Sequence, residues 1–410
     1  MNRERLLERF LRYVRVHTTA NDDTTEYPSS AGQWELGRLL AAEMEEMGLQ
    51  QVRQDDHGLV WGTVPGNAEA PVIAFNAHLD TSPETSGQNV QPQVVSSYAG
   101  GDIVLPGDST KVISVADNPE LNDLHGSTLI TTDGTTLLGA DDKAGIAIIL
   151  EAAQWLLEHP EIPHGEIRIV FTCDEEIGRG TQHLDVQDVG AVAAYTLDGS
   201  GANQLDVETF SADAALVRIR GINIHPSIAK DRMVNAVRAA GTFLDALPRD
   251  TLAPEATCQR EGFLHPYLIE GGVDEVRLRV LLRDFDTSRL EQHAALLRRV
   301  ATQVEEQFPG LAIEIEVTRQ YRNLGDGLTK EPRAVDYAVR AHQRLGREAK
   351  LSIVRGGTDG SLMTELGLPT PNLSSGQHAQ HSPLEWACLD EMVQAGEVVL
   401  EIARVWQELG

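Results

Sequence analysis

The sequence predicts an α/β protein, in which a mostly parallel sheet covered by helices is interrupted by a smaller inserted α+β domain. Helix and strand patterns alternate over residues 1–210, as they do in chains that build parallel sheets. Strand patterns of period two dominate residues 211–319, and the alternation returns over residues 320–410. We therefore expect one discontinuous domain, residues 1–210 with 320–410, and an inserted domain, residues 211–319.

The first part of the chain contains two helix patterns and three strand patterns. Apolar residues from Leu36 to Met44 form one stripe at helical spacing, and Gly48 ends that helix. The strand that begins at Pro71 is apolar until it reaches polar residues at its end. The predicted elements are helices Gln33–Met47 and Lys143–Leu157, and strands Pro71–Asp80, Glu166–Thr172 and Val192–Leu197.

The inserted segment predicts the order βαββαβ, which is the ferredoxin-like arrangement. Its elements are strand Ala214–Arg220, helix Asn235–Leu247, strands Phe263–Glu270 and Glu275–Leu282, helix Thr287–Gln307 and strand Leu311–Val317. After it we expect helix Ala334–Leu345, strand Lys350–Val354 and helix Leu389–Gln407.

Composition excludes several classes of partner. The formal net charge is -28, and DNA or RNA binding requires clustered Lys and Arg, so we expect no nucleic-acid partner. The longest apolar runs, such as Ile146–Leu150, are too short to span a bilayer, and the charged N-terminal segment lacks the apolar core of a secretory signal. The three cysteines are too few and too scattered for a disulfide framework. We therefore expect a cytoplasmic protein with no membrane partner.

Acidic residues and histidines stand where predicted strands end. His78 and Asp80 share one face of an extended chain, so Asp80 can orient the imidazole of a metal-bound His78. Asp141 and Asp142 precede a helix, where we assign Asp142 to capping and Asp141 to bridging two cations. Ligands of parallel sheets gather at such strand ends.

Three further strand ends leave alternatives open. Glu175 and Glu176 follow one predicted strand. They could form an acidic, solvated turn, or one could bind a metal while the other carries a proton. Asp198 precedes Gly199, a pair more typical of a turn. In the loop before the last helix, either His378 or His381 could be a ligand.

Taken together, these residues at the predicted strand ends indicate a function more clearly than any one of them does. His, Asp and Glu without Cys form a site for borderline or hard divalent ions. Two cations bridged by one carboxylate, with one free Glu to carry a proton, are typical of a hydrolase active site.

Longer motifs run through the chain: HLDTSPETSGQNVQPQVVSSYAGGDI (78–103), LLGADDKAG (137–145), FTCDEEIGRG (171–180), GINIHPSIAKDRMVNA (221–236), LLRDFD (281–286), RGGTDGS (355–361) and HSPLEW (381–386). In these motifs the chain resembles the peptidase T family of tripeptide aminopeptidases, subfamily M20B of the M20 metallopeptidases.

The resemblance implies a zinc-exopeptidase-like catalytic domain with two Zn²⁺ ions per subunit. It implies His78 and Asp198 as ligands of one zinc, Glu176 and His381 as ligands of the other, and Asp141 as the bridge. It makes Asp80 the support of His78 and Glu175 the general base and acid, and it selects His381 over His378.

The resemblance also implies that the inserted domain is a lid or dimerisation domain. His225 would stabilise the oxyanion, and Asn235, Arg283 and Arg355 would bind the substrate backbone or its C-terminal carboxylate. Leu384, where Phe is common, and the loop 374–380 depart from the family pattern near the site.

We expect an aminopeptidase that releases the N-terminal residue of tripeptides by attack of metal-activated water. The alternatives are an M20 dipeptidase, an N-acyl-amino-acid deacylase, or a non-catalytic protein on this fold. The sequence leaves open the side-chain preference, the physiological metal, whether the chain forms a homodimer, and whether the lid is open or closed.

Overall fold

The structure of residues 1–410, a computed structural model, divides into two compact units. Unit 1 comprises Met1–Val207, Gly327–Ile353 and Thr358–Gly410, and unit 2 comprises Glu208–Asp326 and Val354–Gly357. The short segment Val354–Gly357 belongs to unit 2 because Arg355 packs over Phe210 and Phe263 there.

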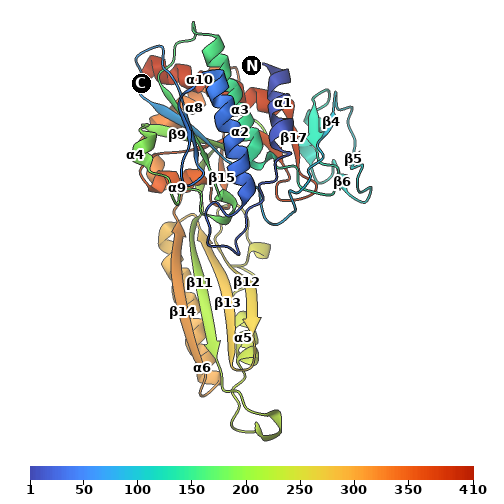
Figure 1. Ribbon diagram of the computed structural model, residues 1–410. Coiled ribbons are helices and arrows are strands. Elements are labelled where there is room, and N and C mark those ends of the chain that lie inside the picture. The colour runs from blue at the N-terminus through green and yellow to red at the C-terminus, as the bar shows by residue number, and fades with distance from the viewer. The chain divides into compact units, whose positions relative to one another are not determined.

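Unit 1 is built on one large mixed sheet (Figure 1). Its central strands run in the order β8-β3-β9-β16 and are parallel to one another, whereas the strands at both edges are antiparallel. The strands are β1 Gln50–Gln54, β2 Val60–Val64, β3 Ile73–His78, β4 Gln93–Val95, β7 Leu129–Thr131, β8 Ile167–Thr172, β9 Ala193–Ser200, β10 Gln204–Thr209, β15 Lys350–Val354, β16 Asn372–His378 and β17 Trp386–Cys388. A small hairpin joins β5, Ile103–Val104, to β6, Val112–Ile113.

Helices cover both faces of this sheet. On β3, Phe75 packs in the large core with α1, α2, α3 and α10, while its neighbour Ala74 packs on the opposite face with residues of α4 and α9. Alternate residues of one strand therefore serve two cores, as expected of a sheet buried on both sides. The helices of unit 1 are α1 Arg3–Tyr13, α2 Ala31–Met47, α3 Ala140–Glu158, α4 Val186–Val189, α8 Arg333–Arg344, α9 Asp359–Glu365 and α10 Leu389–Leu409. The short helix α7, Leu324–Leu328, contains the point in the sequence where unit 2 ends and unit 1 resumes.

Unit 2 contains a four-stranded antiparallel sheet in the order β12-β13-β11-β14, and helices α5 and α6 supply its core (Figure 1). The elements are β11 Ser211–Arg220, α5 Ala236–Asp245, β12 Phe263–Gly271, β13 Glu275–Asp284, α6 Thr287–Gln307 and β14 Ala312–Tyr321. Their order along the chain is the predicted βαββαβ.

The predicted α/β class with a parallel central sheet is confirmed. One local prediction was wrong: Gln377 and His378 were expected in a loop, but they end strand β16, which is buried along its whole length. None of the helices combines the length and the apolar character that a membrane crossing requires.

Candidate active site

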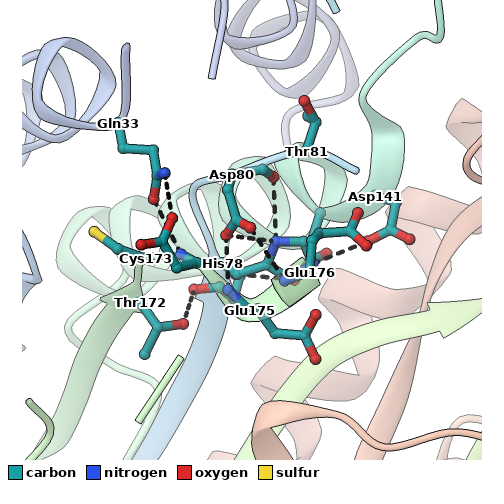
Figure 2. A network of polar contacts seen from close by, with 12 residues as sticks. Gln33, His78, Asp80, Thr81, Asp141, Thr172, Cys173, Glu175 and Glu176 are labelled. Carbon is teal, nitrogen blue, oxygen red and sulfur yellow. Dashed lines mark hydrogen bonds and ion pairs between the residues drawn. The ribbon is translucent and has the colours of Figure 1, made fainter. Parts of the chain in front are cut away.

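Residues from five separate segments of unit 1 meet at the carboxyl ends of the parallel strands. His78 ends β3, and Asp198 lies near the end of β9. Asp141 stands at the start of α3, the turn after β8 carries Glu175 and Glu176, and His381 follows β16. Figure 2 shows His78, Asp141 and both glutamates gathered in one network.

The two carboxylate oxygens of Asp141 face two different imidazoles. Its Oδ1 lies 2.9 Å from His78 Nε2, and its Oδ2 lies 3.3 Å from His381 Nε2. The same nitrogen of His381 lies 2.9 Å from Glu176 Oε2, and His78 Nε2 lies 3.8 Å from Asp198 Oδ1. Asp141 therefore stands between two sets of ligand atoms, which is the position of a bridging carboxylate. The Asp141–Asp142 peptide bond is cis.

The donor set fits a pair of divalent cations. The ligand atoms of His78, Glu175 and Asp198 lie within 4.8 Å of one another, and so do those of His78, Asp141 and Glu176. Glu176 Oε1 is buried and has no hydrogen-bond partner, although a buried carboxylate oxygen ordinarily requires one. Nitrogen and carboxylate donors suit Zn²⁺, Co²⁺ and Mn²⁺, so the ligands alone do not select the metal.

The electrostatics of the cluster also favour bound positive charge. Burial raises the pKa of Glu176 to about 8 and that of Asp198 to about 6, in each case reinforced by the nearby Asp141. Burial alone would lower the pKa of His381, but its contacts with Asp141 and Glu176 raise it to about 11. Crowded carboxylates of this kind require protons or cations among them to offset their mutual repulsion.

Asp80 connects His78 to the two glutamates. Its Oδ1 accepts a hydrogen bond from the Glu175 backbone N–H at 3.0 Å, and its Oδ2 accepts one from the Glu176 N–H at 3.1 Å (Figure 2). The same Oδ1 lies 3.4 Å from His78 Nδ1, whose other contact is the Asp80 carbonyl oxygen at 3.2 Å. One fully buried carboxylate thus fixes both the imidazole orientation and the turn that carries the glutamates.

The turn after β8 is anchored to helix α2. Asp174 has a left-handed backbone, with φ of 60°, and its carboxylate accepts hydrogen bonds from the Ser29 N–H at 2.7 Å and from Gln33 Nε2 at 2.7 Å. Gln33 Oε1 in turn accepts from the Asp174 N–H at 3.0 Å. This exchange of hydrogen bonds holds Glu175 and Glu176 at the strand end.

Two of the neighbouring residues have local structural roles. Asp142 Oδ1 accepts from the Gly145 N–H at 3.2 Å; since Asp141 and Asp142 have non-helical backbone angles within α3, this bond caps only the regular part of the helix that follows them. His378 is stacked on Trp386 at 3.8 Å, and its Nε2 lies 2.6 Å from Glu391 Oε2.

Sequence reasoning missed two buried charges beside the site. Lys143 is 2% exposed and donates from Nζ to the Val16 carbonyl oxygen at 2.8 Å. Burial lowers the pKa of Lys143 to about 7, against the opposing charges of Glu385 and Asp80. Glu385 is also buried, and it binds the backbone of the turn before α3. Both residues lie in motifs that the sequence singled out, but a charge in a motif does not show its partner.

The four predicted substrate residues belong to unit 2, where each makes local contacts. His225 Nδ1 lies 2.7 Å from Ser227 Oγ, and Asn235 caps α5 by accepting from the backbone N–H groups of Val237 and Arg238. Arg283 donates to the carbonyl oxygens of Asp213 and Leu282, each at 3.1 Å.

Arg355 donates more hydrogen bonds than His225, Asn235 or Arg283. Its Nη1 donates to the carbonyl oxygens of Gln259 and Glu261, each at 2.8 Å, and its Nη2 donates to Thr257 Oγ1 at 2.9 Å. In this structure its guanidinium therefore holds the loop 257–261.

The model of peptidase family M20/M25/M40 matches residues 130–405 of the chain. The chain belongs to this family. Among curated relatives of this M20 peptidase, peptidase T of Geobacillus kaustophilus (strain HTA426) is 44% identical over 408 residues, covering 99% of both chains. Peptidase T of Listeria monocytogenes serotype 4a (strain HCC23) is also 44% identical over 408 residues, with the same coverage. The resemblance to the peptidase T family is confirmed, and the chain is a peptide hydrolase.

Two solved structures share the fold of this M20 peptidase over its whole length. Aminopeptidase PepT from Bacillus cereus ATCC 10987 is 25% identical, with a TM-score of 0.76 and coverage of 99% of each chain. A tripeptidase from Staphylococcus aureus subsp. aureus Mu50 is 26% identical, with a TM-score of 0.77 and coverage of 100% of this chain and 99% of that chain.

Proposed function

We propose that this M20 peptidase releases the N-terminal residue from tripeptides with the help of two divalent cations. The observation that carries the proposal is the position of Asp141, one of whose carboxylate oxygens lies next to His78 and the other next to His381. Relatives named peptidase T match the chain from end to end, and a solved structure of the same fold is named a tripeptidase. Substrate class and metal centre are thus supported by independent observations.

We assign one cation to His78 and Asp198 and the other to Glu176 and His381, with Asp141 shared by both. Zn²⁺ is our proposed metal, because histidine nitrogen and carboxylate oxygen are ligands that zinc accepts. When bound, such a pair polarises the scissile carbonyl and lowers the pKa of water.

The protein's own groups supply positioning and proton transfer. Glu175 is assigned as the group that takes a proton from the attacking water onto its carboxylate and delivers it to the leaving amine. Its ligand atom lies within 4.8 Å of those of His78 and Asp198, so it faces the same space. Asp80 keeps Glu175 there through the backbone bond described above.

For the inserted unit we retain two proposals. His225 would donate to the oxyanion that develops on the carbonyl, and Asn235, Arg283 and Arg355 would bind the peptide backbone and its C-terminal carboxylate. Arginine selection of a free carboxylate would also limit substrate length. Comparing kcat/KM for a tripeptide and its C-terminal amide tests this, and equal values would exclude the arginine role.

The test of the function is hydrolysis of a dipeptide, a tripeptide, a tetrapeptide and an N-acetylated tripeptide. Each is incubated with the zinc-loaded protein, with the chelated protein, and after zinc, cobalt or manganese is returned. Cleavage confined to the free tripeptide, lost on chelation and restored by metal, is the expected result. Cleavage of the dipeptide or the acetylated peptide would keep the metal centre but replace the substrate by that of a dipeptidase or deacylase.

We also propose that the enzyme acts in the cytoplasm and forms a homodimer through unit 2. All three cysteines are unpaired, which suits a reducing compartment. The outer strands β12 and β14 of unit 2 are edges that a second copy could pair with. Cell fractionation tests the first proposal and light scattering after gel filtration tests the second.

A further inference from the structure

Glu385 is a buried carboxylate whose hydrogen bonds all run to one backbone turn. It is 1% exposed and lies four positions after His381 in the chain. Its Oε2 accepts from the N–H groups of Leu138 and Gly139, each at 2.7 Å, and its Oε1 accepts from the N–H of Asp141 at 3.0 Å. Three backbone donors therefore converge on a side chain from the opposite end of the sequence.

The turn that Glu385 fills is shaped to receive an anion. Gly139 has φ of 78°, a left-handed conformation that glycine adopts without strain, and this bend brings the N–H groups on both sides of Ala140 to the same side. Successive N–H groups in such a bend form a concavity that binds negative charge. A carboxylate suits it, because both of its oxygens only accept hydrogen bonds when ionised.

The loop that joins Glu385 to His381 is short and internally bonded. The Glu385 N–H donates to the Ser382 carbonyl oxygen at 3.1 Å, and Ser382 Oγ accepts from the Leu384 N–H at 3.1 Å. The His381 carbonyl oxygen also accepts from Thr85 Oγ1 at 2.7 Å. Movement of Glu385 would therefore be transmitted to His381.

We propose that Glu385 is a positioning residue that sets the spacing between Asp141 and His381, and through it the affinity for the cation that these two residues share. Its side chain contacts backbone groups and no ligand side chain, so it acts by holding the two loops together. Asp141 Oδ2 and His381 Nε2 lie 3.3 Å apart, and each belongs to one of the two segments that Glu385 joins. This inference rests on the proposed metal centre and names a residue outside its ligand set.

The test replaces Glu385 by Gln, which keeps the side-chain shape but presents an NH₂ group to backbone donors. Zn²⁺ affinity is measured by competition with a chromophoric chelator, alongside the Tm of the metal-free protein and the KM and kcat for a tripeptide. We expect E385Q to bind Zn²⁺ roughly 10- to 100-fold more weakly than the wild type.

The matched control is Glu151→Gln. Glu151 is fully buried on helix α3, at whose start the Glu385 partner Asp141 lies, but it binds Arg5 and Arg9 instead of the site. We expect E151Q to lower Tm without changing Zn²⁺ affinity, which separates positioning from general stabilisation. Unchanged Zn²⁺ affinity in E385Q, or an equal loss in E151Q, would overturn the proposal.

A fallback variant and two results with the wild-type protein complete the test and keep the inference separable from the proposed function. Should E385Q not fold, Glu385→Asp is the second variant: it keeps the negative charge, but its shorter side chain moves the carboxylate oxygens away from the three backbone N–H donors. We expect its Zn²⁺ affinity to fall. Wild-type Zn²⁺ affinity in E385D would overturn the proposal. A wild-type protein that binds Zn²⁺ without cleaving tripeptides would refute the proposed function alone. A wild-type protein that binds no Zn²⁺ would refute both.

Discussion

Replacing Asp80 by Asn is expected to impair the enzyme although it replaces none of the proposed metal ligands. Both oxygens of Asp80 accept backbone hydrogen bonds, from Glu175 at 3.0 Å and from Glu176 at 3.1 Å. The amide side chain of D80N has one oxygen, so it can accept only one of these bonds, and its NH₂ group then faces the other backbone N–H, donor against donor. The turn carrying both glutamates must then shift or leave a donor unpaired.

The size of the effect follows from one lost bond to a charged group. Such a bond contributes about 1.5–3 kcal/mol, and a buried site offers no water to replace it. At about 1.4 kcal/mol for each factor of ten, kcat/KM for a tripeptide should fall roughly 10- to 150-fold. Most of the loss should appear in kcat, because Glu175 is displaced from the reacting atoms.

The assay compares D80N with the wild type in steady-state tripeptide hydrolysis, with circular dichroism to confirm folding. Asp55→Asn is a suitable control, because Asp55 also accepts backbone bonds, from His57 at 2.9 Å and Leu59 at 3.1 Å, within the turn between β1 and β2. We expect D55N to stay within about twofold of the wild type. A folded D80N with wild-type kcat/KM would refute the role assigned to Asp80.

Three more predictions concern catalysis, stability and pH. Glu175→Gln should lower kcat roughly 10²- to 10⁴-fold while Zn²⁺ content, measured by metal analysis, stays unchanged; retained kcat would remove Glu175 as proton carrier. Glu151→Ala should cost about 1–3 kcal/mol in urea unfolding, because it removes one of the two carboxylates that pair with the buried Arg9, whose Nη1 lies 2.5 Å from Glu151 and whose Nε lies 2.7 Å from Glu43; a loss below about 0.5 kcal/mol would contradict this. Burial lowers the pKa of His342, whose Nδ1 lies 2.8 Å from the Ala338 carbonyl oxygen. Below a pH of about 6.5 this histidine therefore binds a proton more readily in the unfolded chain than in the folded protein, which favours unfolding. The free energy of unfolding should therefore fall between pH 7 and pH 5, and His342→Gln should show a smaller fall; parallel curves would exclude this group.

Helices and strands with a strongly periodic pattern of apolar residues could be predicted from the sequence alone. Strand β13, Glu275–Asp284, alternates apolar and charged residues, because one face of its sheet packs on helices. Four of the proposed ligands, His78, Glu176, Asp198 and His381, lie at or just beyond the ends of parallel strands as expected, because parallel strands bring their carboxyl ends to one edge, whereas Asp141 lies at the start of α3.

Strand β16 shows where this reasoning fails. Its sequence, NLSSGQH, is polar and has no apolar alternation, yet every residue is buried. Its polar groups are paired inside the sheet: Ser375 donates to the Gly199 carbonyl oxygen at 3.1 Å, and Gln377 donates to that of Asp198 at 3.0 Å. Burial here depends on partners in β9 that periodicity cannot reveal. Glu385 was missed for the same reason, since its partners are backbone groups almost 250 residues away in the chain.

The place of β16 beside β9 also has a consequence for protein synthesis. His381 and Glu385 are translated after the other four segments of the centre, and β16, the strand that precedes His381, must pair with β9, which is made much earlier. A chain still emerging from the ribosome therefore carries the first four segments of the centre without the fifth. On the proposed function, the nascent enzyme stays inactive toward the peptides around it until β16 has been made and has paired with β9.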